Sequence, residues 1–343
     1  MITFHSPGAP SGPLEPGAGC AELSAPAVWI DMFEPTTEEE QALEAALGIN
    51  IPTREEMQEI ELSSRLYKEG DALFMTSMVV ANASTDNPTS SAVTFIVMPN
   101  RLVTLRYAQP APFQSFRAQR DAHPELYRNG HDVLAGLLDA IIDRIADILE
   151  SVGASLDRIS LKIFDAEAPG GGSNWDRHPT KSKSGKRRRQ RQYDFVDILR
   201  RIGCTSDLVS RARESLVSFA RLVAYYREMQ HDNPAAREAL VHLKTVAGDL
   251  GSLSDHASFM SGKISFLLEA TLGMINNEQN GIIKIVSVAA VVFLPPTLVA
   301  SVYGMNFEVM PELRWVAGYP FALLLMVISA VLPYALFKRK GWL

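Results

Sequence analysis

The stretch that decides the fold lies near the C-terminus, where residues 282–306 read IIKIVSVAAVVFLPPTLVASVYGMN. Its apolar part, 282–302, carries one charge, Lys284, and runs directly into Tyr303-Gly304-Met305-Asn306. A second apolar segment, 319–337, carries no charge. The hydrocarbon core of a bilayer is about 30 Å thick, and about 20 apolar helical residues cross it. We therefore predict two transmembrane helices joined by a polar loop, 303–318.

Basic residues next to the two segments predict how the chain is oriented in the membrane. They are Lys284 at the start of the first segment and Lys338, Arg339 and Lys340 in the tail 338–343 that follows the second. The connecting loop has two carboxylates, Glu308 and Glu312, against one cation. Cytoplasmic loops carry an excess of lysine and arginine. We expect a multi-pass membrane protein with both termini in the cytoplasm and the four basic residues at the cytoplasmic interface.

The rest of the chain is long enough for a cytoplasmic domain, since the protein has 343 residues and a net charge of −6. Its two cysteines, Cys20 and Cys204, are far apart and form no C-x-x-C pair. This spacing argues against a disulfide framework or a cysteine-based zinc site. Residues 1–26 are rich in proline and glycine, and we expect them to form a flexible N-terminal tail.

Residues 27–130 have the mixed pattern of an α/β domain. Capping boxes at Thr36–Glu39 and Thr53–Glu56 each predict the start of a helix, and the first helix is expected to end at Gly48. Runs rich in β-branched and aromatic residues predict strands. The expected strands are 73–80, 92–98 and 101–106, the last two joined by a turn at Pro99-Asn100.

Residues 131–281 are predicted to form a stalk, or funnel, of long helices. Apolar residues at helical spacing predict one helix from His131 to near Phe164 and a second over 190–230. A third helix begins near Ala235 and meets no helix breaker before the membrane. At about 1.5 Å per residue, this helix would extend about 70 Å before it enters the first span.

The third helix carries apolar residues in a heptad pattern, which predicts a coiled-coil-like seam. The seam residues are Ala239, Leu243, Val246, Leu250, Leu253, Ala257, Met260, Ile264, Leu267, Thr271 and Met274. Two interpretations remain open. The seam packs against the two preceding helices of the same chain, or it assembles copies of the chain around an axis.

The segment 165–189 interrupts the helices and is predicted to be a basic loop at the membrane-proximal end of the stalk, since successive helices run antiparallel. Its basic residues are Lys181, Lys183, Lys186, Arg187, Arg188 and Arg189. Contact with anionic lipid headgroups would contribute about 1 kcal/mol per cation near the surface. A solvated loop is the alternative interpretation. We expect membrane lipid as a partner and no nucleic acid.

The sequence lacks the patterns of common enzyme sites. Its seven histidines form no H-E-x-x-H, and Gly170-Gly171-Gly172 is not followed by Gly-Lys-Ser/Thr at P-loop spacing. No G-x-S-x-G occurs. We therefore expect no enzyme and no organic cofactor.

One face of the first span is small or weakly polar, interrupted by two larger apolar residues. This ladder is Asn280, Ile283, Ser287, Ala290, Leu294, Thr297 and Ser301. Such a face suits the lining of a pore in which hydrophobic rings at Ile283 and Leu294 gate by dewetting. Tight helix packing through small residues is the alternative. Two spans cannot enclose a pore, so a pore requires a symmetric ring of subunits.

The motifs around the first span resemble those of the CorA family of divalent-cation transporters. They are Phe293-Leu294-Pro295-Pro296-Thr297, then Tyr303-Gly304-Met305-Asn306-Phe307-Glu308, Met310-Pro311-Glu312-Leu313, and the closing Lys338-Arg339-Lys340-Gly341-Trp342-Leu343. The stretches 53–57 and 61–66 of the soluble part are also similar to this family. The resemblance covers nearly the whole chain from about Ala27.

The resemblance implies a CorA-like homopentamer with an α+β cytoplasmic domain, a long-helix funnel and two C-terminal transmembrane helices, the first of which lines the pore. It implies a selectivity filter at Gly304, Met305 and Asn306, and recruitment of cations by Glu308 and Glu312. Family members are also gated by cytoplasmic Mg²⁺ bound between subunits. Alignment with the motif places the regulatory carboxylate at Glu269, with Asp86 as its partner.

The function implied is uptake of Mg²⁺, and also of Co²⁺ and Ni²⁺, driven by the membrane potential. A divalent ion gains about 4.6 kcal/mol per 100 mV, twice the value for one charge. Mg²⁺ is then both the transported and the regulatory ion. Two alternatives remain: a zinc transporter on the same scaffold, coupled or not to protons, and, from another functional class, a membrane-anchored sensor or scaffold whose pore is vestigial.

Overall fold

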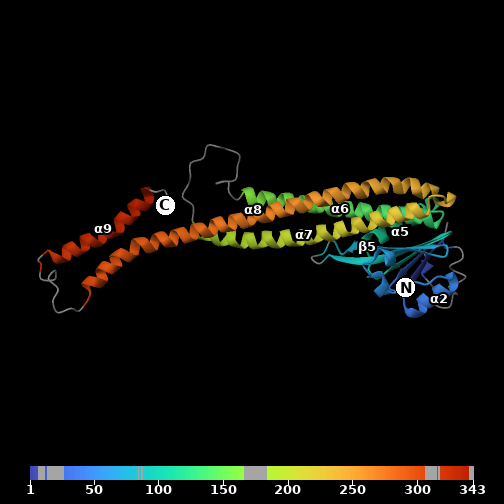
Figure 1. Cartoon of the computed structure of the whole chain (residues 1–343), viewed down its shortest axis with the longest axis horizontal. Coiled ribbons are helices and arrows are strands. Elements are labelled where there is room, and N and C mark those ends of the chain that lie inside the picture. The colour runs from blue at the N-terminus through green and yellow to red at the C-terminus, as the bar shows by residue number, and fades with distance from the viewer. Residues whose placement is uncertain are drawn as a thin grey trace. The chain divides into compact units, whose positions relative to one another are not determined.

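The computed structural model describes residues 1–6, 12–13, 27–83, 85, 88–165, 184–305, 315 and 317–339. The chain divides into two compact units, Met1–Leu268 and Glu269–Leu343, and one helix runs from the first into the second (Figure 1). The first unit holds a sheet and the stalk helices. The second holds the two apolar segments.

The first unit is built on a seven-stranded sheet with the order β2-β1-β3-β7-β6-β5-β4. The strands are β1 (Ile2–His5), β2 (Gly12–Pro13), β3 (Trp29–Phe33), β4 (Leu66–Glu69), β5 (Ala72–Ala81), β6 (Thr89–Met98) and β7 (Arg101–Arg106). β3 pairs with β7 in parallel, and the other pairs are antiparallel. The predicted strands are confirmed, including the pairing of β6 with β7 that joins Met98 to Arg101.

Short helices cover one face of this sheet. They are α2 (Thr37–Leu47), α3 (Arg54–Met57) and α4 (Leu62–Arg65), and α5 (Ala111–Ala122) follows β7 before the 3-10 turn η1 (Pro124–Leu126). Both predicted capping boxes are present at Thr36 and Thr53. Gly48 ends α2 with φ 67°, a left-handed conformation that favours glycine. Leu43 and Met57 anchor α2 and α3 in the apolar core beneath the sheet.

A buried ion pair joins β3 to β7. The Asp31 carboxylate accepts two hydrogen bonds from the Arg106 guanidinium, at 3.0 and 2.8 Å, and a third from the Thr104 hydroxyl at 2.9 Å. Arg117 on α5 also reaches Asp31, at 3.3 Å. The Arg106 and Asp31 side chains are 4% and 1% exposed, so this bidentate pair lies out of reach of solvent. It fixes the register where the two strands run parallel.

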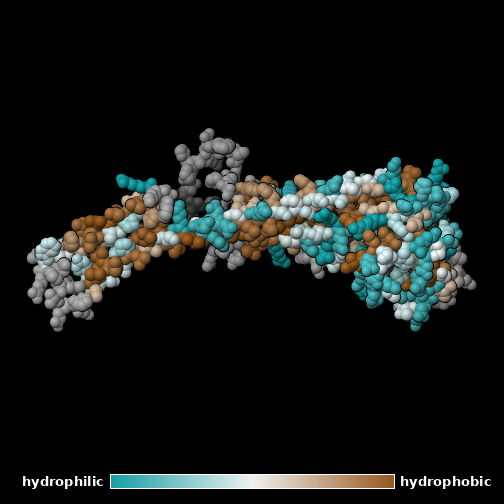
Figure 2. Space-filling view, in the orientation of Figure 1, coloured by the Kyte–Doolittle hydropathy of each residue, from teal (hydrophilic) through white to brown (hydrophobic). Residues whose placement is uncertain are grey.

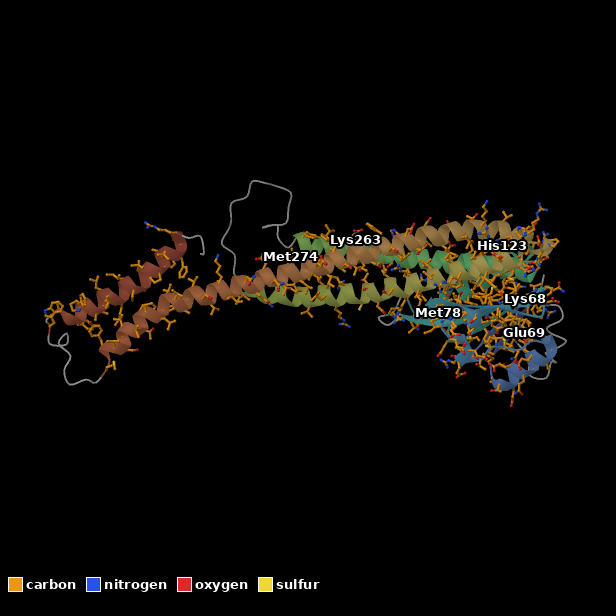
Figure 3. All side chains as sticks on the ribbon, in the orientation of Figure 1. Lys68, Glu69, Met78, His123, Lys263 and Met274 are labelled. Atoms are coloured by element: carbon orange, nitrogen blue, oxygen red, sulfur yellow. The ribbon has the colours of Figure 1, made fainter. Side chains whose placement is uncertain are left out.

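The stalk helices are α6 (Gly130–Asp165), α7 (Ser184–Met229) and α8 (Arg237–Tyr303), with the short turn η2 (Pro234–Ala236) before α8. α7 lies against the sheet, because the Ser215 hydroxyl donates to the Met78 carbonyl at 2.6 Å. α6 and α8 run in the same direction side by side, and Lys263 Nζ donates to Asp157 at 2.6 Å (Figure 3). The antiparallel order of the predicted helices is thereby confirmed.

The heptad seam of α8 is buried inside the chain itself. Ala239, Leu243, Val246, Leu250, Ala257, Met260, Ile264 and Leu267 are all 5% exposed or less. The interpretation that the seam packs against the two preceding helices is confirmed for these residues. Leu253 lies half-buried on the same face. Assembly of copies would therefore have to use another face of α8.

Two predictions for the first unit are wrong. Residues 1–26 are not a flexible tail throughout: β1 is buried and pairs with β3, because Ile2 and Phe4 add their side chains to the core. The loop predicted over 165–189 ends earlier, since α7 begins at Ser184, and the backbone of 186–189 is helical. Lysine and arginine are good helix formers, so the basic run extends the helix rather than interrupting it.

The second unit contains the C-terminal part of α8 and α9 (Gly318–Arg339). Both helices are long and apolar enough to cross a membrane, each with a window of mean hydropathy 2.2. Figure 2 shows the hydrophobic residues, in brown, along both of them. The predicted architecture of an α/β domain, long helices and two apolar C-terminal helices is therefore confirmed. Pro295 and Pro296 lie within α8, and Pro333 lies within α9.

Candidate functional site

In the second unit, α8 has one stripe of residues that are less exposed than the others. The half-buried residues are Gly281, Val288, Val292, Pro295, Pro296, Val299 and Tyr303. Most of them lie three, four or seven positions apart, and at 100° per residue all of them fall on one side of the helix. α9 has a matching stripe, formed by Gly318, Ala322, Met326, Ser329, Ala330, Pro333 and Phe337. Since α8 and α9 are the helices of this unit, the two stripes face each other.

The ladder predicted to line a pore lies on the opposite side of α8. All seven of its residues, Asn280, Ile283, Ser287, Ala290, Leu294, Thr297 and Ser301, are exposed in the single chain. A helix turns by about 100° per residue, which places the ladder roughly 180° from the stripe around Val292. α9 therefore covers the back of α8 and leaves the ladder free. Packing of the ladder against the chain's own second span is not what the structure shows.

The ladder combines small or weakly polar side chains with two larger apolar ones. Ile283 and Leu294 are 62% and 66% exposed. The Thr297 hydroxyl donates to the Phe293 carbonyl at 2.7 Å, so its remaining lone pairs face outward. Pro295 and Pro296 have no N–H groups, which leaves the carbonyls of Val291 and Val292 without their usual helical donors.

The motif after the ladder begins where α8 ends. The Gly304 N–H donates to the Ala300 carbonyl at 2.9 Å, and the Met305 N–H donates to the Val302 carbonyl at 3.3 Å. A Cβ atom at position 304 would lie 3.1 Å from the Ala300 oxygen, so glycine fits this close turn. Met305 is 47% exposed. The predicted filter residue Asn306 and the loop carboxylates Glu308 and Glu312 lie outside the described residues.

Three of the basic residues that flank the spans are exposed on the described helices. Lys284 lies on α8, and Lys338 and Arg339 lie in the last turn of α9. Lys340 lies outside the described residues. Cations in the last turn of a helix also interact favourably with the partial negative charge of its carbonyls.

The predicted regulatory carboxylate, Glu269, is exposed on α8. Its predicted partner, Asp86, lies outside the described residues. Within the part of the chain that the structure describes, no group of three or more His, Cys, Asp and Glu side chains is arranged to hold a metal ion. The structure thus places Glu269 on the surface of the single chain.

Sequence reasoning missed a row of carboxylates on the stalk. Asp139, Asp143 and Asp147 lie four residues apart on α6, and Asp143 also lies near Asp249 of α8. Burial, and then the neighbouring carboxylates, raise the pKa of Asp143 above its usual range. The i, i+4, i+8 spacing within α6 could have revealed the row. The approach of Asp249 depends on how α8 packs, which that spacing does not encode.

Comparisons with known proteins agree with the arrangement of these elements. A family model described as CorA-like Mg²⁺ transporter protein matches residues 24–173 and 195–339. The Magnesium transport protein CorA of Sodalis glossinidius (strain morsitans) is 36% identical over 318 residues, 92% of this chain and 92% of that protein. The protein of the same name from Escherichia coli (strain K12) has the same identity and coverage.

Among solved structures, the complete structure of the CorA magnesium transporter from Methanocaldococcus jannaschii aligns with a TM-score of 0.70. It is 16% identical and covers 100% of this chain and 99% of its own, which is a likeness of fold. The family resemblance found at residues 303–308 is confirmed by the family match over most of the chain. The chain belongs to the family of CorA-like Mg²⁺ transporter proteins.

Proposed function

We propose that the protein conducts Mg²⁺ through a membrane, by a pore that the α8 ladder lines. The observation that carries this proposal is the free ladder: α9 covers one side of α8, and the small polar residues lie on the other. Names of the relatives support the choice of ion, since both are magnesium transport proteins. The direction is inward, because the membrane potential attracts a divalent cation with about 4.6 kcal/mol per 100 mV.

The pore is formed by a homopentamer in this proposal, with one α8 helix from each subunit around the axis. Cyclic symmetry closes the ring and brings copies of the same ladder residue to one level. Ser287, Ala290 and Thr297 then form narrow rings of small side chains, and Ile283 and Leu294 form larger apolar rings able to exclude water. Membrane lipid surrounds α9 in this arrangement.

Selection of the ion is assigned to Gly304, Met305 and Asn306 at the outer end of the pore. Mg²⁺ loses its water ligands reluctantly and usually keeps several of them. Neutral amide and carbonyl oxygens can bind those waters without removing them, and the ladder has no carboxylate that would hold the ion tightly. Glu308 and Glu312 raise the cation concentration at the mouth. Co²⁺ and Ni²⁺ are expected to pass by the same route.

Regulation is proposed to occur at a second class of Mg²⁺ site, formed between subunits by Glu269 and Asp86. The exposure of Glu269 in the single chain leaves it available to a neighbouring copy. The protein is not an enzyme in this proposal and needs no organic cofactor. It lies in a bacterial inner membrane with both termini in the cytoplasm, where Lys284, Lys338, Arg339 and Lys340 contact the headgroups.

A cysteine-accessibility experiment tests the pore face. In a background in which Cys20 and Cys204 are replaced by serine, Ser287→Cys and Ala290→Cys are compared with Val288→Cys and Val292→Cys. Liposome uptake of Mg²⁺ is measured before and after a membrane-impermeant thiol reagent. We expect the reagent to block uptake by the two ladder variants and to spare the two variants on the α9 side. Equal block in both pairs would contradict the assignment of the pore face.

The same liposomes test the filter and the ion. Asn306→Ala is expected to abolish Mg²⁺ uptake while the protein still elutes as the wild-type assembly in gel filtration. Uptake is compared for Mg²⁺, Co²⁺, Ni²⁺ and Zn²⁺, with and without a pH gradient. Zn²⁺ uptake that requires the gradient, without Mg²⁺ uptake, would identify the zinc transporter instead. Assembly without any flux would identify a sensor or scaffold.

A further inference from the structure

Apart from the ion pathway, the first unit has two neighbouring cavities lined by arginines that form no ion pair among the described residues. The larger, about 540 Å³, lies between α4, α7 and the stalk helix α8. The smaller, about 290 Å³, lies between α3 and β6. Arg65 lines both cavities, so they meet at its side chain. We call the two cavities together the arginine groove.

The groove is strongly cationic. Its described lining contains four arginines, Arg54, Arg65, Arg213 and Arg221, and one carboxylate, Glu214. None of the four arginines takes part in an ion pair within the described residues. Other arginines on α7 do form such pairs: Arg201 with Asp197, and Arg211 with Asp207. The groove therefore concentrates positive charge that the chain does not neutralise.

Hydroxyl groups lie beside these arginines. Ser90 lines the smaller cavity, and its Oγ atom is buried with no hydrogen-bond partner among the described residues. The Ser218 Oγ atom accepts a hydrogen bond from the Met78 N–H at 3.1 Å, and its own hydrogen remains available for donation (Met78 is labelled in Figure 3).

The larger cavity also has an apolar wall. Ile60, Leu62 and Val217 line it and are 88%, 50% and 37% exposed. Apolar side chains beside a set of arginines suit a ligand that carries both anionic oxygens and a flat apolar group. A cavity of about 540 Å³ lies within the range of small-molecule sites.

We propose that the arginine groove binds a nucleoside triphosphate. The phosphates contact the guanidinium groups of Arg213, Arg221 and Arg65, which match phosphate oxygens in a bidentate manner. The base packs on Ile60, Leu62 and Val217. The proposal concerns a site separate from the ion pathway, and it stands or falls independently of Mg²⁺ conduction.

Binding is tested on the full-length protein in neutral detergent, with EDTA present so that metal sites do not contribute. The probe is fluorescently labelled ATP, followed by anisotropy at fixed ionic strength and displaced by unlabelled ATP, AMP or inorganic triphosphate. We expect saturable binding, displaced best by ATP. Arg213→Ala and Arg221→Ala should each lower the affinity by about tenfold or more, because each removes a charged hydrogen bond.

Arg200→Ala is the matched control. Arg200 is exposed on the same helix, lines neither cavity and gives the same change in net charge. Its affinity should stay within about twofold of the wild type, since a long-range charge effect is screened at physiological salt. Gel filtration and circular dichroism confirm that each variant is folded.

Four results would overturn the proposal: no saturable binding by the wild type, an equal loss in Arg200→Ala, displacement by triphosphate as good as by ATP, or better displacement by phosphatidylglycerol micelles. Displacement by triphosphate as good as by ATP would show that the groove does not bind the base. Better displacement by phosphatidylglycerol micelles would identify a lipid headgroup as the ligand. A protein that binds ATP and conducts no Mg²⁺ would keep this proposal and refute the proposed function. Conduction without ATP binding would do the reverse.

Discussion

Removal of the Asp31 carboxylate should destabilise the first unit severely. In Asp31→Ala, the Arg106 guanidinium loses both of its hydrogen bonds to the carboxylate while its side chain stays 4% exposed. Arg106 keeps its contact with the Ala108 carbonyl and the rings of Phe33 and Phe113. These contacts hold it in place, so the unpaired charge has no short route to solvent.

The expected cost follows from this burial. Removing one partner of a buried ion pair costs about 3–5 kcal/mol, out of about 5–15 kcal/mol for a whole domain. One kcal/mol shifts the midpoint of thermal unfolding by about 2–4 °C for a unit of this size class. Asp31→Ala should therefore lower the unfolding temperature of the detergent-solubilised protein by roughly 6–20 °C, measured by circular dichroism.

Two controls make the measurement decisive. Asp207→Ala removes the partner of Arg211 in an exposed pair, whose side chains are 52% and 32% exposed, and should cost at most about 1 kcal/mol. The double variant Asp31→Leu/Arg106→Met removes both buried charges and should be clearly more stable than Asp31→Ala. A shift no larger than that of Asp207→Ala, or a double variant as unstable as the sum of the singles, would refute the reasoning.

Two further predictions concern the same unit. Burial, followed by Arg120 and Arg117, lowers the pKa of His5 from 6.5 to about 3. As the pH falls, His5 takes up a proton in the unfolded chain at a higher pH than in the folded one. The free energy of unfolding should therefore fall as the pH drops from about 6.5 toward 3, by at most about 1.4 kcal/mol per pH unit. His5→Phe should flatten the dependence of unfolding temperature on pH. Gly136→Ala should cost about 1–3 kcal/mol in chemical unfolding, since its Cβ would lie 2.6 Å from Tyr127. Gly203→Ala, with open space around it on α7, should be neutral or stabilising.

Local signals account for the parts of the fold that the sequence predicted. The capping boxes at Thr36 and Thr53 depend on residues three positions apart, and both formed as expected. The strands around Phe74 and Phe95 contain consecutive β-formers, and Pro99-Asn100 supplies a turn between neighbours. In each case the residues that decide the structure are adjacent in the chain.

Long-range contacts account for the parts that were missed. β1 has only four residues, and it is held by β3, whose partner β7 lies some seventy residues further along. Nothing within Ile2–His5 distinguishes such a strand from a tail, because its stability comes from pairing and burial. The burial of Arg106 could not be predicted from the sequence either, since arginine is rarely found in a core without a partner such as Asp31.

The candidate sites also divide into those that local sequence signals predict and those that depend on long-range contacts. The ladder could be predicted because its seven residues share one helix, and helical spacing alone places them on one face. The arginine groove could not, because Arg65 and Arg213 are far apart in the chain and meet only when α4 packs against α7. Filter and regulatory residues were assigned by resemblance, which names positions without giving contacts.

In both units, one face of α8 is packed within the chain and another face stays exposed. In the first, the chain's own helices bury the heptad seam, while Val241, Phe259 and Phe266 remain 70%, 64% and 58% exposed. By helical periodicity these three lie on a side of α8 well away from the seam. In the second, α9 covers the stripe around Val292 and leaves the ladder open. Exposed apolar surface of this kind marks sites of association. A ring of copies would bury Val241, Phe259 and Phe266 between neighbouring stalks. It would also close the ladder around an axis, so α8 would supply both the assembly surface and the pore.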